Sequence, residues 1–162
     1  MPQRAEELRQ SDLGAAVSLE LIDQNRIGRR LADYRGTNLV LYFYPKDDTP
    51  GCTVEGKEFR ELHDQFLALD CTVIGVSTDS VESHANFAAK HGLPFTLLSD
   101  RDGELASAFG VLNGAMAERA TFVLDRDGRV ARAFLEVAPR GHAQRVLNFV
   151  RNLLESHRML GG

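Results

Sequence analysis

The sequence predicts an α/β fold in which a mixed central sheet is flanked by helices and preceded by an N-terminal β-hairpin. Residues 38–44 form a continuous apolar run, as in a strand that is buried on both faces. A helical pattern follows, and residues 71–77 form a second apolar run. A strand, a helix and a strand in succession indicate a parallel pair joined by a right-handed crossover. With 162 residues, of which 43% are hydrophobic, we expect one domain with one well-buried core over residues 1–162.

The N-terminal part of the chain contains the predicted hairpin. Residues 1–13 are charged and weakly patterned, so we expect a loosely ordered lead-in or a short helix there. Residues 17–22 alternate between apolar and polar, residues 23–26 are typical of a turn, and Ile27 begins a second short segment. This pattern favours two antiparallel strands.

Two helices are predicted in the middle of the chain. The first covers residues 52–69, in which apolar side chains three and four positions apart form one stripe for the sheet. The members of this stripe are Phe59, Leu62, Phe66 and Leu69. The second helix begins after Ser80, a good N-cap residue, and runs to about His91, with Gly92 just past its end.

The C-terminal half continues the alternation of strands and helices. In order, we expect a strand over 95–98, a helix over 104–109, two strands over 120–124 and 130–135 that flank a turn at 125–128, and a last helix over 141–157. The apolar side chains expected to face inward from the last helix are Val146, Phe149, Val150 and Leu153. We find no internal repeat and no linker.

Composition excludes several classes of function. The formal net charge of −4 gives no electrostatic support for binding nucleic acid or an anionic membrane. No apolar run approaches the ~18 residues of a membrane span, and the N-terminus has no signal-peptide pattern. Two cysteines suit a reducing compartment better than a disulfide scaffold. We therefore expect a cytoplasmic protein without nucleic-acid or membrane partners.

The loop after the first buried strand carries the clearest chemical signal. Cys52 stands where the predicted helix begins, and a helix N-terminus presents free N–H groups and a partial positive charge. The pKa of a cysteine, ordinarily about 8.5, falls to roughly 3.5–7.5 at such positions. Thr49 lies three residues upstream, where its hydroxyl could reach the sulfur or a polar substrate. Pro45 and Pro50 stiffen the loop and remove two N–H donors. The stretch is suited to holding a reactive thiolate.

These residues resemble those of a known family. Pro45, Thr49 and Cys52 form a Pro-x-x-x-Thr-x-x-Cys pattern similar to the peroxidatic motif of the peroxiredoxins. The flanking sequence Phe43-Tyr-Pro-Lys-Asp-Asp-Thr-Pro-Gly-Cys-Thr-Val-Glu resembles the bacterioferritin-comigratory (Q-type) subfamily. Further matching segments are Gly75-Val-Ser-Thr-Asp, Phe95-Thr-Leu-Leu-Ser-Asp, Phe109-Gly-Val and Arg119-Ala-Thr-Phe-Val-Leu-Asp. The resemblance runs from about Gly14 to the last helix and implies a thioredoxin-like (peroxiredoxin) fold.

The resemblance also implies a role for each of five residues. Cys52 would attack the O–O bond of a peroxide and become a sulfenic acid. Thr49 would position the peroxide and hydrogen-bond the sulfur, and Pro45 would shield the thiolate from water. Arg119, before the strand at 120–124, would favour the thiolate and polarise the peroxide, because its charge is permanent. Glu55 either orients that arginine or is a favourable charge at the helix N-terminus. No metal or other cofactor is implied.

The chain departs from the Q-type pattern at Lys57. Many members carry a resolving cysteine there, five residues after the peroxidatic one. The second cysteine, Cys71, is separated from Cys52 by a helix near 25 Å long at about 1.5 Å per residue, whereas a disulfide requires Cα atoms within about 7 Å. We therefore interpret Cys71 as a core residue and expect a one-cysteine mechanism. The role of Lys57 itself stays open.

The expected function is that of a thiol-dependent peroxidase that reduces hydrogen peroxide and organic hydroperoxides. Its reductant would be a small thiol or a thioredoxin-like protein, and a monomer is expected, with a weak dimer as the alternative. Two other mechanisms stay open: a two-cysteine cycle through Cys71, within or between chains, and a redox sensor or chaperone-like protein in which Cys52 oxidises once without turnover.

Other candidate sites are weaker. The five histidines show no clustered ligand spacing, so we expect no metal site. Asp47 and Asp48 are adjacent loop carboxylates, and we expect them to be solvated. No Cys-x-x-Cys, Gly-x-Gly-x-x-Gly or P-loop motif is present, which argues against a disulfide oxidoreductase and against a nucleotide site.

Overall fold

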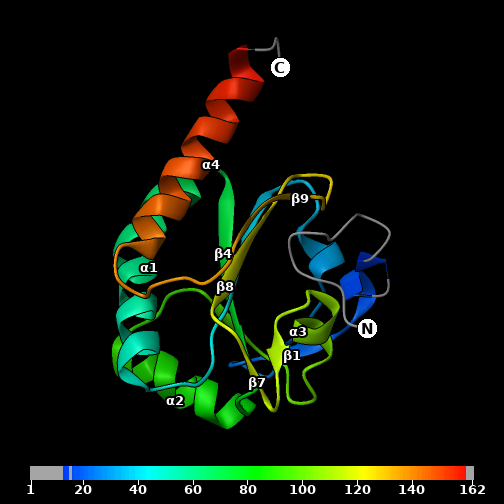
Figure 1. The fold of residues 1–162 in the computed structure, drawn as a ribbon, viewed down its shortest axis with the longest axis vertical. Helices are drawn as coiled ribbons and strands as arrows, with labels where there is room; N and C mark the ends of the chain where they lie inside the picture. Colours follow the sequence, from blue (N-terminus) through cyan, green and yellow to red (C-terminus); the bar gives the residue numbers. More distant parts are fainter. Residues whose placement is uncertain (1–12, 15, 160–162) are drawn as a thin grey trace.

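A computed structural model describes residues 13, 14 and 16–159 of the chain (Figure 1). The α-helices are α1 (Pro50–Ala68), α2 (Val81–His91), α3 (Glu104–Ala108) and α4 (His142–Met159). The strands are β1 (Leu21–Asp23), β2 (Gly28–Arg29), β3 (Asn38–Phe43), β4 (Cys71–Ser77), β5 (Thr96–Ser99), β6 (Leu112–Asn113), β7 (Met116–Ala117), β8 (Ala120–Leu124) and β9 (Val130–Phe134). In the described part of the N-terminal region, η3 (Ala16–Ser18) and η4 (Leu31–Tyr34) are short 3-10 helices.

Seven strands form one mixed sheet in the order β2-β1-β5-β4-β3-β8-β9. The central strand β3 pairs in parallel with β4, with Asn38 opposite Cys71 and Phe43 opposite Val76. On its other side β3 pairs antiparallel with β8. The predicted parallel pair joined by a helix and the predicted mixed sheet are both confirmed.

The sheet separates two apolar cores because successive side chains of a strand point to opposite faces. From β3, Leu39, Leu41 and Phe43 enter the core that is closed by α3 and the N-terminal segment. Val40, Tyr42 and Tyr44 enter the opposite core, which is closed by α1, α2 and α4. Figure 1 shows α1 and α4 side by side along that face. All six residues of β3 are buried, which explains its continuous apolar run.

The N-terminal hairpin is shorter than expected. Residues 17 and 18, expected at the start of the first strand, belong instead to η3, because Ala16 and Val17 pack into the core rather than pairing with a neighbouring strand. The hairpin consists of β1 and the two-residue β2, and the buried Asp23 carboxylate holds its turn by accepting hydrogen bonds from the backbone N–H groups of Asn25 and Ile27. Residues 1–12 of the expected lead-in lie outside the described residues, and Leu13 is buried in the core.

The other elements follow the sequence pattern closely. Ser80 caps α2 by accepting a hydrogen bond from the Ser83 N–H group, and Gly92 ends the helix in the left-handed conformation, with a φ of 60°. Helix α1 begins at Pro50, two residues earlier than expected. The small hairpin of β6 and β7 was not expected, because two-residue strands are too short for a periodic signal. Among the described helices, none has both the length and the apolar character of a membrane span.

Gly75 on β4 lies at a point where the core beneath α1 leaves no room for a side chain. A Cβ atom at this position would lie 2.8 Å from Leu97 Cδ2 and 2.9 Å from Tyr42 Cζ. The Tyr42 ring cannot move aside freely, because it stacks on Phe59 with ring centroids 4.6 Å apart. Glycine is therefore required here by the close approach of a strand to an aromatic ring.

We predict that Gly75→Ala lowers the free energy of unfolding by about 1–3 kcal/mol, the usual effect of overpacking a core. Urea denaturation followed by circular dichroism measures it. Gly56→Ala on α1 is the control, because its added Cβ would meet nothing closer than Leu93 Cδ1 at 3.6 Å. That change should be neutral or stabilising by up to about 1 kcal/mol, through helix propensity. Unchanged stability of Gly75→Ala would contradict this account of the core.

Candidate active site

Cys52 lies in the first turn of α1, at the carboxyl end of the central strand. Strand β3 ends at Phe43, and α1 starts at Pro50, where a proline is favourable because the first helical residue needs no N–H partner. The Cys52 side chain is nearly buried, with a relative exposure of 2%. Ligand sites of open α/β folds occur at this edge of the sheet.

Arg119 reaches Cys52 because of how the strands pair. It precedes β8, whose first residue, Ala120, lies opposite Phe43 at the end of β3. The start of β8 therefore adjoins the loop that leads into α1. Arg119 Nη2 donates a hydrogen bond to Cys52 Sγ at 3.4 Å. The structure thus brings together two residues that are 67 positions apart in the sequence.

Glu55 fixes the other side of the same guanidinium. Arg119 Nη1 lies 2.7 Å from Glu55 Oε1 in an ion pair, and Glu55 is fully buried on α1. Burial raises the pKa of Glu55 to about 7, although the pair with Arg119 acts in the opposite direction. Its second oxygen, Oε2, is buried without a hydrogen-bond partner, which fits a carboxyl that takes up a proton easily.

The Arg119 guanidinium keeps its charge in this setting. Partial burial alone would lower its pKa, but the neighbouring Glu55 and Cys52 outweigh that effect and hold the pKa of Arg119 above its usual value. The site therefore contains a permanent cation in contact with the sulfur.

Gly51 and Pro139 enclose this contact. A Cβ on Gly51 would lie 3.0 Å from Arg119 Nη2 and 3.1 Å from Pro139 Cγ, so only glycine leaves the guanidinium its place beside the sulfur. The loop that carries Pro139 is tied to α1 because the Gly141 N–H group donates to Glu58 Oε1 at 2.8 Å. No sequence signal pointed to Pro139, because its role depends on a contact between distant segments.

Thr49 and Pro45 lie in the loop before α1, and both are half-buried. The Thr49 hydroxyl donates to the backbone carbonyl of Lys46 at 2.9 Å, a partner that was not among the two expected from the sequence, the Cys52 sulfur and a polar substrate. Because its hydrogen is directed toward Lys46, the oxygen of Thr49 keeps lone pairs that can accept a hydrogen bond.

Cys71 is at the opposite end of the sheet from Cys52. It is the first residue of β4 and pairs with Asn38 at the beginning of β3, whereas Cys52 follows the end of β3. Burial, together with the nearby Asp70, raises the pKa of the Cys71 thiol to about 12. Cys71 is therefore a protonated core thiol near neutral pH, and neither cysteine is in a disulfide.

His142 lies behind the site at the start of α4, where its Nε2 is 2.7 Å from Thr121 Oγ1. Burial lowers its pKa to about 4, and the nearby Arg145 and Arg119 act in the same direction. This imidazole is therefore neutral near pH 7 and adds no second positive charge beside Arg119.

Asp47 corrects the expectation of two solvated loop carboxylates. Asp48 is exposed, but Asp47 is buried, with a relative exposure of 7%, and contacts His84 on α2. Asp47, Asp79 and His84 are close enough that their side-chain ligand atoms lie within 4.8 Å of one another. No sequence pattern indicated this cluster, because Asp47 lies 32 and 37 positions before the other two members.

A thioredoxin-like fold that presents a cysteine beside an arginine at a helix N-terminus defines a thiol-based redox protein, and comparison with known proteins gives its family. The model of the AhpC/TSA family matches residues 14–133. Peroxiredoxin Bcp of Bacillus subtilis is 41% identical over 148 residues, which cover 86% of this chain and 94% of the relative. Peroxiredoxin Bcp of Xanthomonas campestris is 46% identical over 125 residues, which cover 72% and 78% of the two chains.

Solved structures agree with the sequence relatives. A mutant of Xylella fastidiosa PrxQ superimposes with a TM-score of 0.85 at 40% identity, covering 87% of this chain and 92% of that chain. The chain therefore belongs to the AhpC/TSA family, with Bcp and Q-type peroxiredoxins among its relatives. The expected peroxiredoxin fold and the expected class of activity, a thiol-dependent peroxidase, are both confirmed.

We predict that Glu55 makes stability depend on pH. In the unfolded chain its pKa is near the ordinary 4.5, and in the folded protein it is about 7. The folded state holds this proton more tightly, so the contribution of Glu55 to stability is complete below pH 4.5 and is lost as pH rises through 7. The free energy of unfolding of Glu55→Gln, relative to wild type, should therefore rise between about pH 5 and about pH 8, by at most about 3 kcal/mol.

Urea denaturation at the two pH values measures this change. Glu61→Gln, which makes the same chemical change at an exposed glutamate on the same helix, is the matched control for the substitution itself. A Glu55→Gln difference that stays constant or falls with rising pH would show that the carboxyl is ionised throughout the range.

Proposed function

We propose that this peroxiredoxin reduces hydrogen peroxide and organic hydroperoxides by a one-cysteine mechanism, in which Cys52 is oxidised and an external thiol restores it. The observation that carries the proposal is the contact of Arg119 Nη2 with Cys52 Sγ at 3.4 Å, at the end of the sheet opposite to the protonated Cys71. Organic hydroperoxides are included because the X. campestris bacterioferritin comigratory protein, 40% identical with a TM-score of 0.83, was described for its alkyl peroxide reduction activity.

In the first step, the Cys52 thiolate attacks one oxygen of the peroxide. The S–O bond forms as the O–O bond breaks, the sulfur is oxidised to a sulfenic acid, and the second oxygen leaves as an alkoxide or hydroxide that takes a proton to become an alcohol or water. Negative charge moves from sulfur to the leaving oxygen, so the fixed guanidinium of Arg119 stabilises both ends of the reaction path.

Thr49 and Pro45 complete the site in this proposal. The lone pairs of the Thr49 hydroxyl, whose hydrogen is held by Lys46, accept the hydrogen of the peroxide and orient it toward the sulfur. Pro45 offers no N–H donor and limits water at the thiolate. Glu55 holds Arg119 in place and is not itself in contact with the peroxide.

In the second step, two equivalents of an external thiol return the sulfenic acid to the thiol, with release of a disulfide and water. Two positions at which relatives have a cysteine, and this chain has none, support an external reductant. Lys57, exposed on α1, occupies the place of the Q-type resolving cysteine. In X. campestris peroxiredoxin Q, two cysteines that were each changed to serine lie 36 positions apart. The same interval counted from Cys52 leads to Ala88 on α2, which has no thiol that could resolve a sulfenic acid.

The reductant in this proposal is a small thiol or a thioredoxin-like protein, and the protein acts as a monomer in the cytoplasm. Two free cysteines support a reducing compartment. Among the described residues, the large exposed apolar side chains are few and are spread over the β1–β2 hairpin, α1 and the β6–β7 hairpin, which supports a monomer: Ile22, Ile27, Leu67, Leu112 and Met116.

We predict that one equivalent of hydrogen peroxide adds a single oxygen atom to Cys52 in both wild type and Cys71→Ser, and that both turn over equally with dithiothreitol. Intact mass, free-thiol counting and a peroxide-consumption assay measure this. Excess peroxide without reductant should add a second oxygen, because no internal thiol traps the sulfenic acid.

A Cys52–Cys71 disulfide in wild type, with turnover lost in Cys71→Ser, would contradict the mechanism. Oxidation without turnover by any thiol would instead identify a sensor.

Lys57→Cys is a gain-of-function comparison for the same experiment. Restoring the Q-type cysteine should replace the added oxygen by an intramolecular disulfide and should suppress over-oxidation. The i and i+5 positions of a helix lie about 8–9 Å apart, so the bond requires local unwinding of α1.

A further inference from the structure

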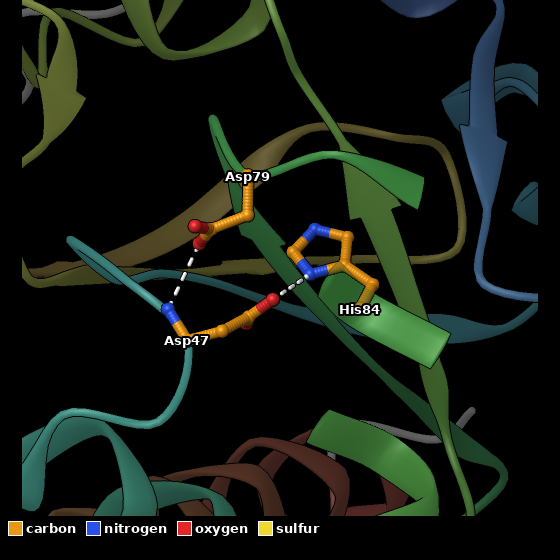
Figure 2. A group of neighbouring side chains, drawn as sticks. All are labelled: Asp47, Asp79 and His84. Atoms are coloured by element: carbon orange, nitrogen blue, oxygen red, sulfur yellow. Dashed lines mark hydrogen bonds and ion pairs between the residues drawn. The ribbon is translucent and has the colours of Figure 1, made fainter. Parts of the chain in front are cut away.

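A buried polar network lies behind the active-site loop, and the proposed reaction does not use it (Figure 2). At its centre, His84 Nδ1 on α2 is 2.7 Å from Asp47 Oδ2, and the His84 side chain is fully buried. The backbone N–H group of Asp47 donates to Asp79 Oδ2 at 2.8 Å. Asp47 is thus held through both its side chain and its backbone, by two residues that are distant from it in sequence.

The remaining polar atoms of the Asp47–His84 pair also have partners. The Tyr44 hydroxyl donates to Asp47 Oδ1 at 2.6 Å, and the Ser83 hydroxyl donates to Asp47 Oδ2 at 2.8 Å. His84 Nε2 lies 3.0 Å from the carbonyl oxygen of Leu98. A carbonyl oxygen only accepts, so Nε2 carries a hydrogen; an ionised Asp47 then requires a hydrogen on Nδ1 as well.

The network joins protein segments to one another through hydrogen bonds and does not form a ligand site. Asp79 Oδ2, which accepts from Asp47, also accepts from the Ser77 hydroxyl at 2.5 Å. Both ring nitrogens of His84 face protein acceptors, and a metal ion would have to displace these bonds. A buried pair of this kind adds little net stability over apolar side chains, but it specifies one arrangement of the chain.

The arrangement that it specifies is that of the active-site loop. Asp47 lies midway between Pro45 and Thr49. The next residue, Asp48, has a φ of 61°, a left-handed conformation that costs free energy in a residue other than glycine. Its exposed carboxylate pairs with Lys90 on α2 at 2.8 Å. The buried contact of Asp47 and the exposed contact of Asp48 therefore fasten a strained turn to the same helix.

We infer that Asp47 and His84 are positioning residues for peroxide reduction: their contact holds the loop of residues 45–49 so that Thr49 and Pro45 stand over Cys52. The inference rests on the proposed function, in which these two loop residues orient and shield the peroxide. A displacement near 1 Å at a reacting group costs on the order of a hundredfold in rate. The rate of Cys52 oxidation should therefore depend on a side chain that touches neither the sulfur nor the peroxide.

Two amide substitutions separate the contacts of His84. In His84→Asn the side-chain nitrogen would lie near the position of Nδ1 and keep a donor for Asp47, whereas in His84→Gln it would reach toward the position of Nε2 and the carbonyl of Leu98. We therefore expect His84→Gln to slow Cys52 oxidation by hydrogen peroxide roughly ten- to hundredfold, and His84→Asn to retain most of the wild-type rate. Competition kinetics against a peroxidase of known rate constant gives the rate constants. Ser83→Ala, which removes one donor to Asp47, should cause a smaller loss of the same kind.

Alkylation of Cys52 by iodoacetamide is the parallel measurement, because it needs the thiolate but not an oriented peroxide. It should stay within about twofold of wild type in all three variants. Glu82→Gln is the control on the same helix, because Glu82 is exposed and makes no side-chain hydrogen bond to residues 45–49 in the part of the chain that the structure describes, and it should leave both rates unchanged. Thermal unfolding shows whether each variant is folded at the assay temperature.

The outcomes separate the two proposals. A fast peroxide reaction in wild type and an equally fast one in folded His84→Gln would overturn the positioning role alone. Equal losses in His84→Asn and His84→Gln, or alkylation slowed in parallel with oxidation, would also overturn it, because they indicate general disturbance of the site. A wild-type protein whose Cys52 does not react with peroxide would overturn the proposed function and, with it, this inference.

Discussion

The guanidinium of Arg119, held between the buried carboxyl of Glu55 and the sulfur of Cys52, is the interaction on which the architecture of the site depends. Its two distances, 2.7 Å to Glu55 Oε1 and 3.4 Å to Cys52 Sγ, can be met together only because both partners project from the first two turns of α1. The arginine itself arrives from the start of β8, which the sheet places next to the end of β3. The site is therefore a product of strand order as much as of the local motif.

The same strand order places the two cysteines in different chemical environments. Parallel pairing of β3 and β4 puts Cys71 level with the start of β3, while the peptide chain reaches Cys52 only after β3 ends. One thiol contacts a cation at a helix N-terminus, and burial raises the pKa of the other to about 12. The protein thus contains one thiol suited to attack and one suited to packing, which is the physical basis for assigning resolution to an external reductant.

The sequence was most informative where local pattern and chemistry coincide. The apolar run of β3, the stripe of α1 and the cap at Ser80 predicted their elements because each depends on neighbours within a few positions. The place of Arg119 came from the family resemblance, since an arginine before a strand carries no signal of its own. The burial of Asp47 and the direction of the Thr49 hydroxyl could not be predicted, because tertiary contacts decide the first and the local backbone geometry of the loop decides the second. The structure thereby adds the contacts of Asp47 and Thr49 to what the motif residues alone indicated.

The most direct test of this account is the rate of Cys52 oxidation in Arg119→Lys. Lysine keeps the positive charge but cannot contact Glu55 and the sulfur through a planar fork. If the fixed guanidinium activates the site, the rate constant with hydrogen peroxide should fall by about a hundredfold or more, while Arg145→Lys on the exposed surface of α4 should leave it unchanged. A lysine variant that reacts within a few-fold of wild type would show that positive charge alone suffices and would contradict the central claim.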